Sequence, residues 1–235
     1  MNFGTRLRDG IRLIHLSTRM VAGRRYWIWP LVTLIWPLFQ LFRVVMEWRE
    51  AFGPGDAQNA LIGIPMTVLG LMLGIRSIAG EIDARTLEIA YTVPGGATRV
   101  WTAKLLGGLS LLLFSEFLLA AVSYVFATSF PIGALYGALQ GAVVYAVLGM
   151  GLATLLKSES AGGLIALGVL AFNFLIQAGN GRISPFFNPT LMTDAEVPEV
   201  LAWTVQNRIG FALIVAAIIA LAFSRSDQRE RMLGT

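Results

Sequence analysis

Long stretches without charged side chains constrain the fold of this chain more than any other feature. The stretch from Leu105 to Leu156 contains a single charged residue, Glu116, and residues 57–75 contain none. A helix needs about 20 apolar residues to cross the hydrocarbon core of a bilayer, so the first stretch is long enough for two crossings. At 56% hydrophobic and 14% charged residues, the composition does not supply the polar surface of a soluble domain. The sequence therefore predicts an all-α membrane protein.

Polar turns divide residues 26–224 into six expected transmembrane helices. Clusters of glycine, proline and serine, such as Gly53-Pro54-Gly55 and Ser129-Phe130-Pro131, mark where the chain turns. The expected spans cover residues 26–46, 60–79, two segments within 105–156, residues 161–178 and residues 209–223. Between the last two spans, residues 179–208 are expected to form an external re-entrant or interfacial segment. In two of the spans glycines recur every fourth residue, at Gly70 and Gly74 and from Gly133 to Gly141, which permits close helix packing.

Residues 1–25 have the pattern of an amphipathic helix that lies along the membrane surface. At about 100° per residue, the arginines Arg8, Arg12 and Arg19 form a narrow stripe. The opposing apolar face contains Phe3, Leu7, Ile11, Ile14 and Val21. We expect an elbow helix whose arginines meet lipid phosphates. The alternative is a basic tail that only sets the topology, and the wide apolar surface disfavours a nucleic-acid partner.

Positive charge is distributed unequally between the two sides that six spans define. One side holds residues 1–25, Arg76, the segment 81–104, Lys157 and the tail 225–235, and carries fourteen of the 18 lysines and arginines. The other side carries Arg43, Arg49, Arg182 and Arg208. Cytoplasmic loops carry the excess of lysine and arginine. We therefore expect a multi-pass protein of the bacterial inner membrane with both termini in the cytoplasm.

A charged segment, residues 81–104, separates the second and third spans. Glu81, Asp83, Arg85 and Glu88 cannot lie in hydrocarbon, so this segment is expected to rest on the cytoplasmic surface as a short helix. A connector without any partner is the alternative interpretation.

The same segment resembles the cytoplasmic loop of permease subunits of ABC-2 type ABC transporters. The resemblance rests on Asp83-Ala84-Arg85-Thr86-Leu87-Glu88, followed by Pro94, Arg99 and Lys104. Arg85 stands where that family typically has glycine, and Val93 separates Thr92 from Pro94. A second similarity is Asn188-Pro189, at the place between spans five and six where the family often carries this pair.

The resemblance implies a dimer of permeases, homomeric or heteromeric, with a separate ATPase subunit below each permease. ATP and Mg²⁺ would bind to that ATPase, and this chain would bind no cofactor and form the pathway for an exported drug, lipid or other amphipathic molecule. The coupling helix that contacts the ATPase would contain Glu81, Ile82, Asp83, Arg85, Leu87 and Glu88.

The motifs of several kinds of active site are missing from the sequence. The only two lysines, Lys104 and Lys157, close no phosphate-binding loop, so the chain is not expected to hydrolyse ATP by itself. It has no cysteine and a single histidine, His15, which leaves no thiolate or multi-histidine metal site.

Glu116 is the one acidic residue expected near the middle of the bilayer, at a depth of about 18 Å from Lys104. An ionisable group at that depth is a functional candidate, here a proton or cation site. The chain would then be a secondary transporter, and this is the alternative function. The simpler interpretation is a protonated carboxyl group that is hydrogen-bonded to Ser123, Gln140 or Tyr145.

Overall fold

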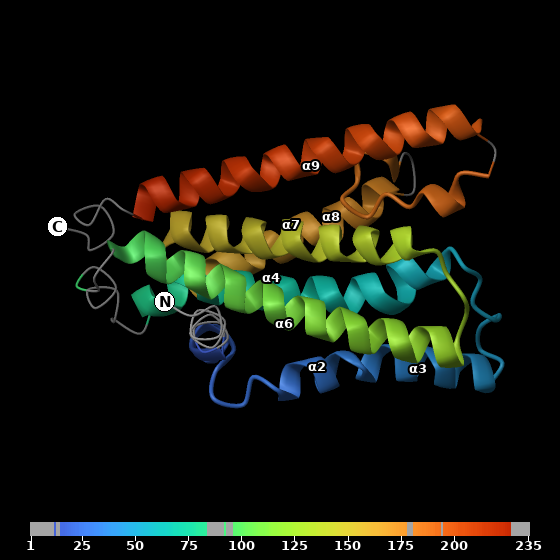
Figure 1. Cartoon of the computed structure of the whole chain (residues 1–235), viewed down its shortest axis with the longest axis horizontal. Coiled ribbons are helices and arrows are strands. Elements are labelled where there is room, and N and C mark those ends of the chain that lie inside the picture. Colours follow the sequence, from blue (N-terminus) through green and yellow to red (C-terminus); the bar gives the residue numbers. More distant parts are fainter. Residues whose placement is uncertain are drawn as a thin grey trace, which may run out of the picture.

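The structure is a computed structural model that describes residues 12, 15–83, 92, 96–177, 181–193 and 195–226. Every regular element in these ranges is a helix (Figure 1). The elements are α2 (Ile28–Thr33), α3 (Ile35–Val45), the π-helix η1 (Ala57–Gly63), α4 (Ile64–Asp83), α6 (Gly96–Phe126), α7 (Ile132–Leu156), α8 (Glu159–Gln177), the 3₁₀-helices η2 (Gly181–Ile183) and η3 (Pro189–Leu191), and α9 (Val197–Ser226).

Five helical segments are long and apolar enough to cross a membrane. They are α2 with α3, η1 with α4, α6, α7 and α9. The prediction of an all-α protein is therefore confirmed for the described residues, and the five apolar segments agree with a membrane protein. The apolar part of α8, Glu159–Leu175, is shorter than these five, so a sixth span stays a prediction.

Two helices extend beyond the apolar spans that the sequence predicts. α6 starts at Gly96, ahead of the uncharged stretch that begins at Leu105, and α9 starts at Val197 rather than near Ile209. The second difference corrects the expected segment 179–208, because its last part belongs to α9. Pro198 lies in the first turn of α9, where proline is tolerated because the first backbone N–H groups of a helix have no partner within it.

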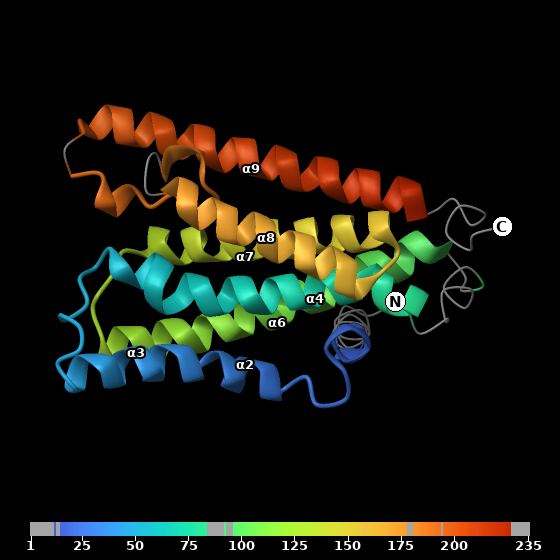
Figure 2. The ribbon, with the colours of Figure 1, turned by 180° about the vertical axis from the view of Figure 1, so that it is seen from behind.

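The long helices run roughly parallel and antiparallel to one another in a bundle (Figures 1 and 2). α9 lies along one edge, α2 and α3 lie along the opposite edge, and α4, α6, α7 and α8 lie between them. We call the end where α4, α7 and α9 finish and α6 and α8 begin the basic end. Residues 181–193 and the loop before η1 lie at the other end, which we call the opposite end.

Glycines let the central helices α4 and α7 approach each other closely. A Cβ atom added to Gly74 would overlap the carbonyl oxygen of Ala146, and one added to Gly70 would overlap that of Ala142. The four-residue spacing of these glycines places both on the face of α4 that meets α7. The backbones therefore touch over a full turn of helix.

Residues 15–22 are helical and pack across α6 near the basic end (Figure 2). The hydroxyl of Thr18 donates a hydrogen bond of 3.2 Å to the carbonyl oxygen of Gly107, while Arg12, Leu16 and Arg19 are exposed. The exposed face thus combines arginine with apolar side chains, as an interfacial helix does. Arg8 lies outside the described residues, so the elbow helix as a whole stays a prediction.

Candidate functional site

The last turn of α4 holds an ion pair that is almost removed from solvent. Lys104 Nζ of α6 lies 2.6 Å from Glu81 Oε1, with 5% and 12% of the two side chains exposed. The same ammonium donates a 3.0 Å hydrogen bond to the carbonyl oxygen of Ser77. Because a buried charge is stable only when paired and hydrogen-bonded, this arrangement fixes the end of α4 against α6.

Trp101 connects the same carboxylate to the core of the basic end. Its indole Nε1 donates to Glu81 Oε2 at 3.3 Å, and its fully buried ring lies 5.8 Å from the ring of Phe223 in α9. Trp101 also belongs to a cluster of buried apolar side chains that includes Ile78 and Met150. Glu81 thus accepts from two side chains of α6, one of which also contacts α9.

Asp83, the last residue of α4, caps the start of α8. Its Oδ2 accepts a 3.0 Å hydrogen bond from the backbone N–H of Glu159, the first residue of α8. The hydroxyl oxygen of Ser158 accepts from the N–H of Ala161 at 3.4 Å. The first N–H groups of a helix have no partner within it, and a carboxylate there also interacts favourably with the helix dipole.

Removing this cap is expected to have a small, measurable effect. Asp83→Ala leaves the Glu159 N–H to solvent and should lower the free energy of unfolding by about 0.5–1 kcal/mol. Asp83→Asn keeps an acceptor but loses the charge, so its loss should be smaller. The stability of both variants can be measured by thermal unfolding in detergent, with gel filtration used to monitor the fraction that stays folded. Equal losses of stability in Asp83→Ala and Asp83→Asn would contradict a role for the charge.

The structure describes three of the six predicted coupling residues. Glu81, Ile82 and Asp83 form the end of α4, and Ile82 is half-buried against the cluster around Trp101. Arg85, Leu87 and Glu88 lie outside the described residues. The Glu81–Lys104 pair is not evident from the sequence, because the two residues are 23 positions apart and belong to different helices.

Glu116 lies in α6 with 7% of its surface exposed, as expected for a residue inside the bundle. Within the described residues its Oε1 has no hydrogen-bond partner. The three expected partners are not bonded to it: Gln140 donates to Asn207, the ring of Tyr145 stacks on Phe186, and the Ser123 hydroxyl is itself without a partner in that part of the chain. The prediction of a hydrogen-bonded carboxyl is therefore wrong for these partners.

A second polar cluster, at the opposite end, holds residues 181–193 against the bundle. Gln58 Nε2 of η1 donates to the carbonyl oxygen of Phe187 at 2.9 Å, and Asn188 Nδ2 donates to that of Gly55 at 2.8 Å. From α9, Asn207 Nδ2 donates to the carbonyl oxygens of Arg182 and Ser184 at 2.8 and 2.9 Å. In the sequence Gln58, Asn188 and Asn207 lie in polar turns or beside other polar residues, so no local pattern distinguished them.

The chemistry available at both clusters is ion pairing and hydrogen bonding. In the described part of the chain no three His, Cys, Asp or Glu side chains lie close enough to hold a metal ion. The basic end joins α4 to α6, α8 and α9 through charged and aromatic side chains, and the opposite end closes the bundle with a short folded segment. Comparison of the chain with models of protein families, with curated proteins and with solved structures finds no match.

Proposed function

We propose that this chain is the permease subunit of an ATP-driven ABC exporter. Two permeases form the pathway for a drug, lipid or other amphipathic molecule, and separate ATPase subunits bind ATP and Mg²⁺. The basic end faces the cytoplasm, and α8 provides the sixth span. The likeness of residues 83–104 to the coupling loop of ABC-2 permeases is the origin of this proposal, and the contacts at the end of α4 support it.

The observation that carries the proposal is the connection of three helices at the point where the predicted coupling segment begins. Glu81 binds Lys104 of α6, and Asp83 binds the first N–H of α8. A movement applied to the residues after Asp83 is therefore passed to α4, α6 and α8 together. Rigid-body motion of helices is the means by which closure of a partner subunit changes access to a pathway.

Site-specific cross-linking tests this proposal, because the natural chain has no cysteine. Glu88→Cys places one thiol in the predicted coupling segment, and Ser129→Cys places one between α6 and α7 at the opposite end. A thiol-directed photo-cross-linker in native membranes should join Glu88→Cys, and not Ser129→Cys, to a chain with a phosphate-binding loop. Equal labelling of that chain by both variants, or by neither, contradicts the proposal.

A second candidate function is a secondary transporter that uses Glu116. The buried Oε1 atom without a partner favours it, because a carboxylate inside a membrane protein is costly unless it binds a proton or a cation. In the proposed ABC exporter, ATP hydrolysis supplies the energy, so Glu116 does not have to gain or lose a proton during transport.

The two functions differ in the expected effect of Glu116→Gln. For the ABC exporter, ATP-dependent export of a fluorescent lipid or dye from proteoliposomes should stay within about twofold, because glutamine has the same shape and replaces only the ionisable oxygen. For a secondary transporter, export driven by an ion gradient should fall by about a hundredfold or more. The assay compares ATP with an imposed proton gradient as the energy source, and loss of gradient-driven export in Glu116→Gln would favour the second function.

A further inference from the structure

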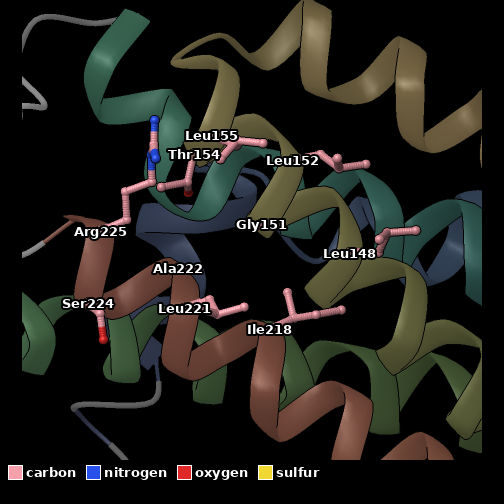
Figure 3. A pocket seen from close by; sticks show the side chains of 10 residues that line it. All are labelled: Leu148, Gly151, Leu152, Thr154, Leu155, Ile218, Leu221, Ala222, Ser224 and Arg225. Atoms are coloured by element: carbon pink, nitrogen blue, oxygen red, sulfur yellow. The ribbon is translucent and has the colours of Figure 1, made fainter.

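A cavity opens between α7 and α9 at the basic end (Figure 3). Its volume is about 480 Å³, within the range of about 300–1,000 Å³ that is usual for small-molecule sites. The residues that line it are Leu148, Gly151, Leu152, Thr154 and Leu155 of α7 and Ile218, Leu221, Ala222, Ser224 and Arg225 of α9.

The walls of this cavity are almost entirely aliphatic. Leucine and isoleucine side chains of both helices face it, and Gly151 lets the two helices meet, since a Cβ there would lie 2.7 Å from Ile218. Apolar walls of this kind suit a hydrocarbon chain, which can enter sideways from the bilayer because α9 lies at the edge of the bundle (Figure 1).

Three polar side chains, those of Thr154, Ser224 and Arg225, interrupt the apolar lining, and two of them, Thr154 and Arg225, indicate the chemistry of a ligand. Thr154 is 0% exposed, and its hydroxyl oxygen has no hydrogen-bond partner in the described part of the chain. Arg225 is exposed, and the two ion pairs among described residues, Arg49–Asp56 and Lys104–Glu81, do not include it. In Figure 3 its side chain extends from α9 toward the side of the cavity that Thr154 and Leu155 line. A ligand that accepts hydrogen bonds and carries negative charge would pair with both groups.

The position of the cavity selects among ligands of that chemistry. It lies at the end of the bundle that also carries Arg19, Arg99 and Lys157, beside the surface where a membrane presents anionic headgroups. A neutral lipid would leave the guanidinium without a counter-ion, and a free phosphate ion would leave the aliphatic walls in contact with water. Both requirements are met by a lipid that has an anionic headgroup.

We propose that the cavity between α7 and α9 is a binding site for an anionic phospholipid of the leaflet at the basic end. One acyl chain lies along the leucines of α7 and α9, the phosphate binds Arg225, and the hydroxyl of Thr154 donates to a headgroup or ester oxygen. The lipid site depends on the membrane location of the chain and not on an ATPase partner. A negative result for the lipid site therefore leaves the proposed transport function untouched, and the reverse also holds.

Native mass spectrometry of the full chain in non-ionic detergent tests this site. The probes are phosphatidylglycerol and diacylglycerol with identical acyl chains, which differ by the presence of the phosphate headgroup. The natural chain should retain one phosphatidylglycerol about tenfold more tightly than diacylglycerol, which corresponds to one charge-assisted contact. Arg225→Gln should remove this preference, and Arg225→Lys should keep most of it. Thr154→Val, which preserves side-chain shape, should weaken phosphatidylglycerol binding about threefold.

Arg76→Gln is the matched control, because Arg76 is an exposed arginine of α4 that does not line the cavity. Its binding should stay within about twofold of the natural chain, whereas equal losses in Arg76→Gln and Arg225→Gln would assign binding to the basic surface and overturn the site. If millimolar phosphate alone displaces the lipid, the site binds a free anion and the lipid proposal is overturned. If the protein dimerises as the lipid is lost, the cavity is an interface with a second copy of the chain, which also overturns the proposal.

Leu221→Trp fills the cavity from an exposed position of α9. This variant should reduce lipid binding without unfolding the protein, and unchanged binding would also contradict the site.

Discussion

Gly74→Ala is expected to destabilise the protein by about 3 kcal/mol. An alanine inside a helix normally stabilises it by about 1 kcal/mol relative to glycine, so propensity alone predicts the opposite sign. At this position the added Cβ overlaps the backbone carbonyl of Ala146, which cannot move unless α4 and α7 separate. Separation loses the close packing that holds helices together in a membrane, where no hydrophobic effect acts between them.

Gly210→Ala provides the matched control for Gly74→Ala. Gly210 also lies inside a long helix, α9, but a Cβ there meets no atom within 4 Å. We expect this variant to be neutral or more stable by up to about 1 kcal/mol. Both variants can be compared by unfolding with increasing mole fractions of SDS in mixed micelles. Similar stabilities of the two variants would show that α4 and α7 are not in backbone contact.

Breaking the Glu81–Lys104 pair is expected to have an effect of similar size. Glu81→Gln leaves the ammonium of Lys104 with the Ser77 carbonyl as its remaining partner and should lower stability by about 3 kcal/mol. Lys104→Met leaves the carboxylate of Glu81 with the indole N–H of Trp101 and should cost a similar amount.

The double variant Glu81→Leu with Lys104→Met distinguishes the cost of leaving one buried charge unpaired from the cost of losing the ion pair itself. Replacing both partners by apolar side chains removes the two charges together, so stability should return to within about 1 kcal/mol of the natural chain. With Glu81→Leu and Lys104→Met as the two single variants, the same unfolding assay gives the interaction free energy from the complete double-mutant cycle. If the effects of the two single changes simply add, the ion pair does not exist in the folded protein.

The absence of charge along the chain was sufficient to predict the five long apolar helices, because burial in hydrocarbon excludes charge whatever the tertiary contacts are. It was not sufficient for the start of α9. Residues 197–208 were expected to belong to a re-entrant or interfacial segment, yet they form the first part of α9, where Trp203, Asn207 and Arg208 contact residues 181–193. Arg182 lies 3.2 Å from the centre of the Trp203 ring, and Asn207 binds two backbone carbonyls of that segment. Polar residues are compatible with a long and mostly apolar helix when they have such partners, which the sequence does not reveal.

The candidate site shows the same limit. Charge density identified the end of α4 as the distinctive segment, and Glu81 and Asp83 were named on that basis. Their roles as partners of Lys104 and of the α8 backbone depend on distances between separate helices. The uncharged run around Glu116 predicted its depth in the bilayer, whereas its burial inside the bundle and the lack of a partner for its Oε1 depend on how α6 is rotated against its neighbours.

The most direct test of the proposed function is purification of the tagged chain from its native membrane in mild detergent. We predict a stoichiometric second chain with a phosphate-binding loop and ATPase activity that vanadate inhibits. Charge reversal by Glu88→Lys should release that chain, whereas Glu47→Lys, in the loop after α3 at the opposite end, should not. A protein that purifies alone, without ATPase activity, would contradict the proposal and favour the ion-coupled function of Glu116.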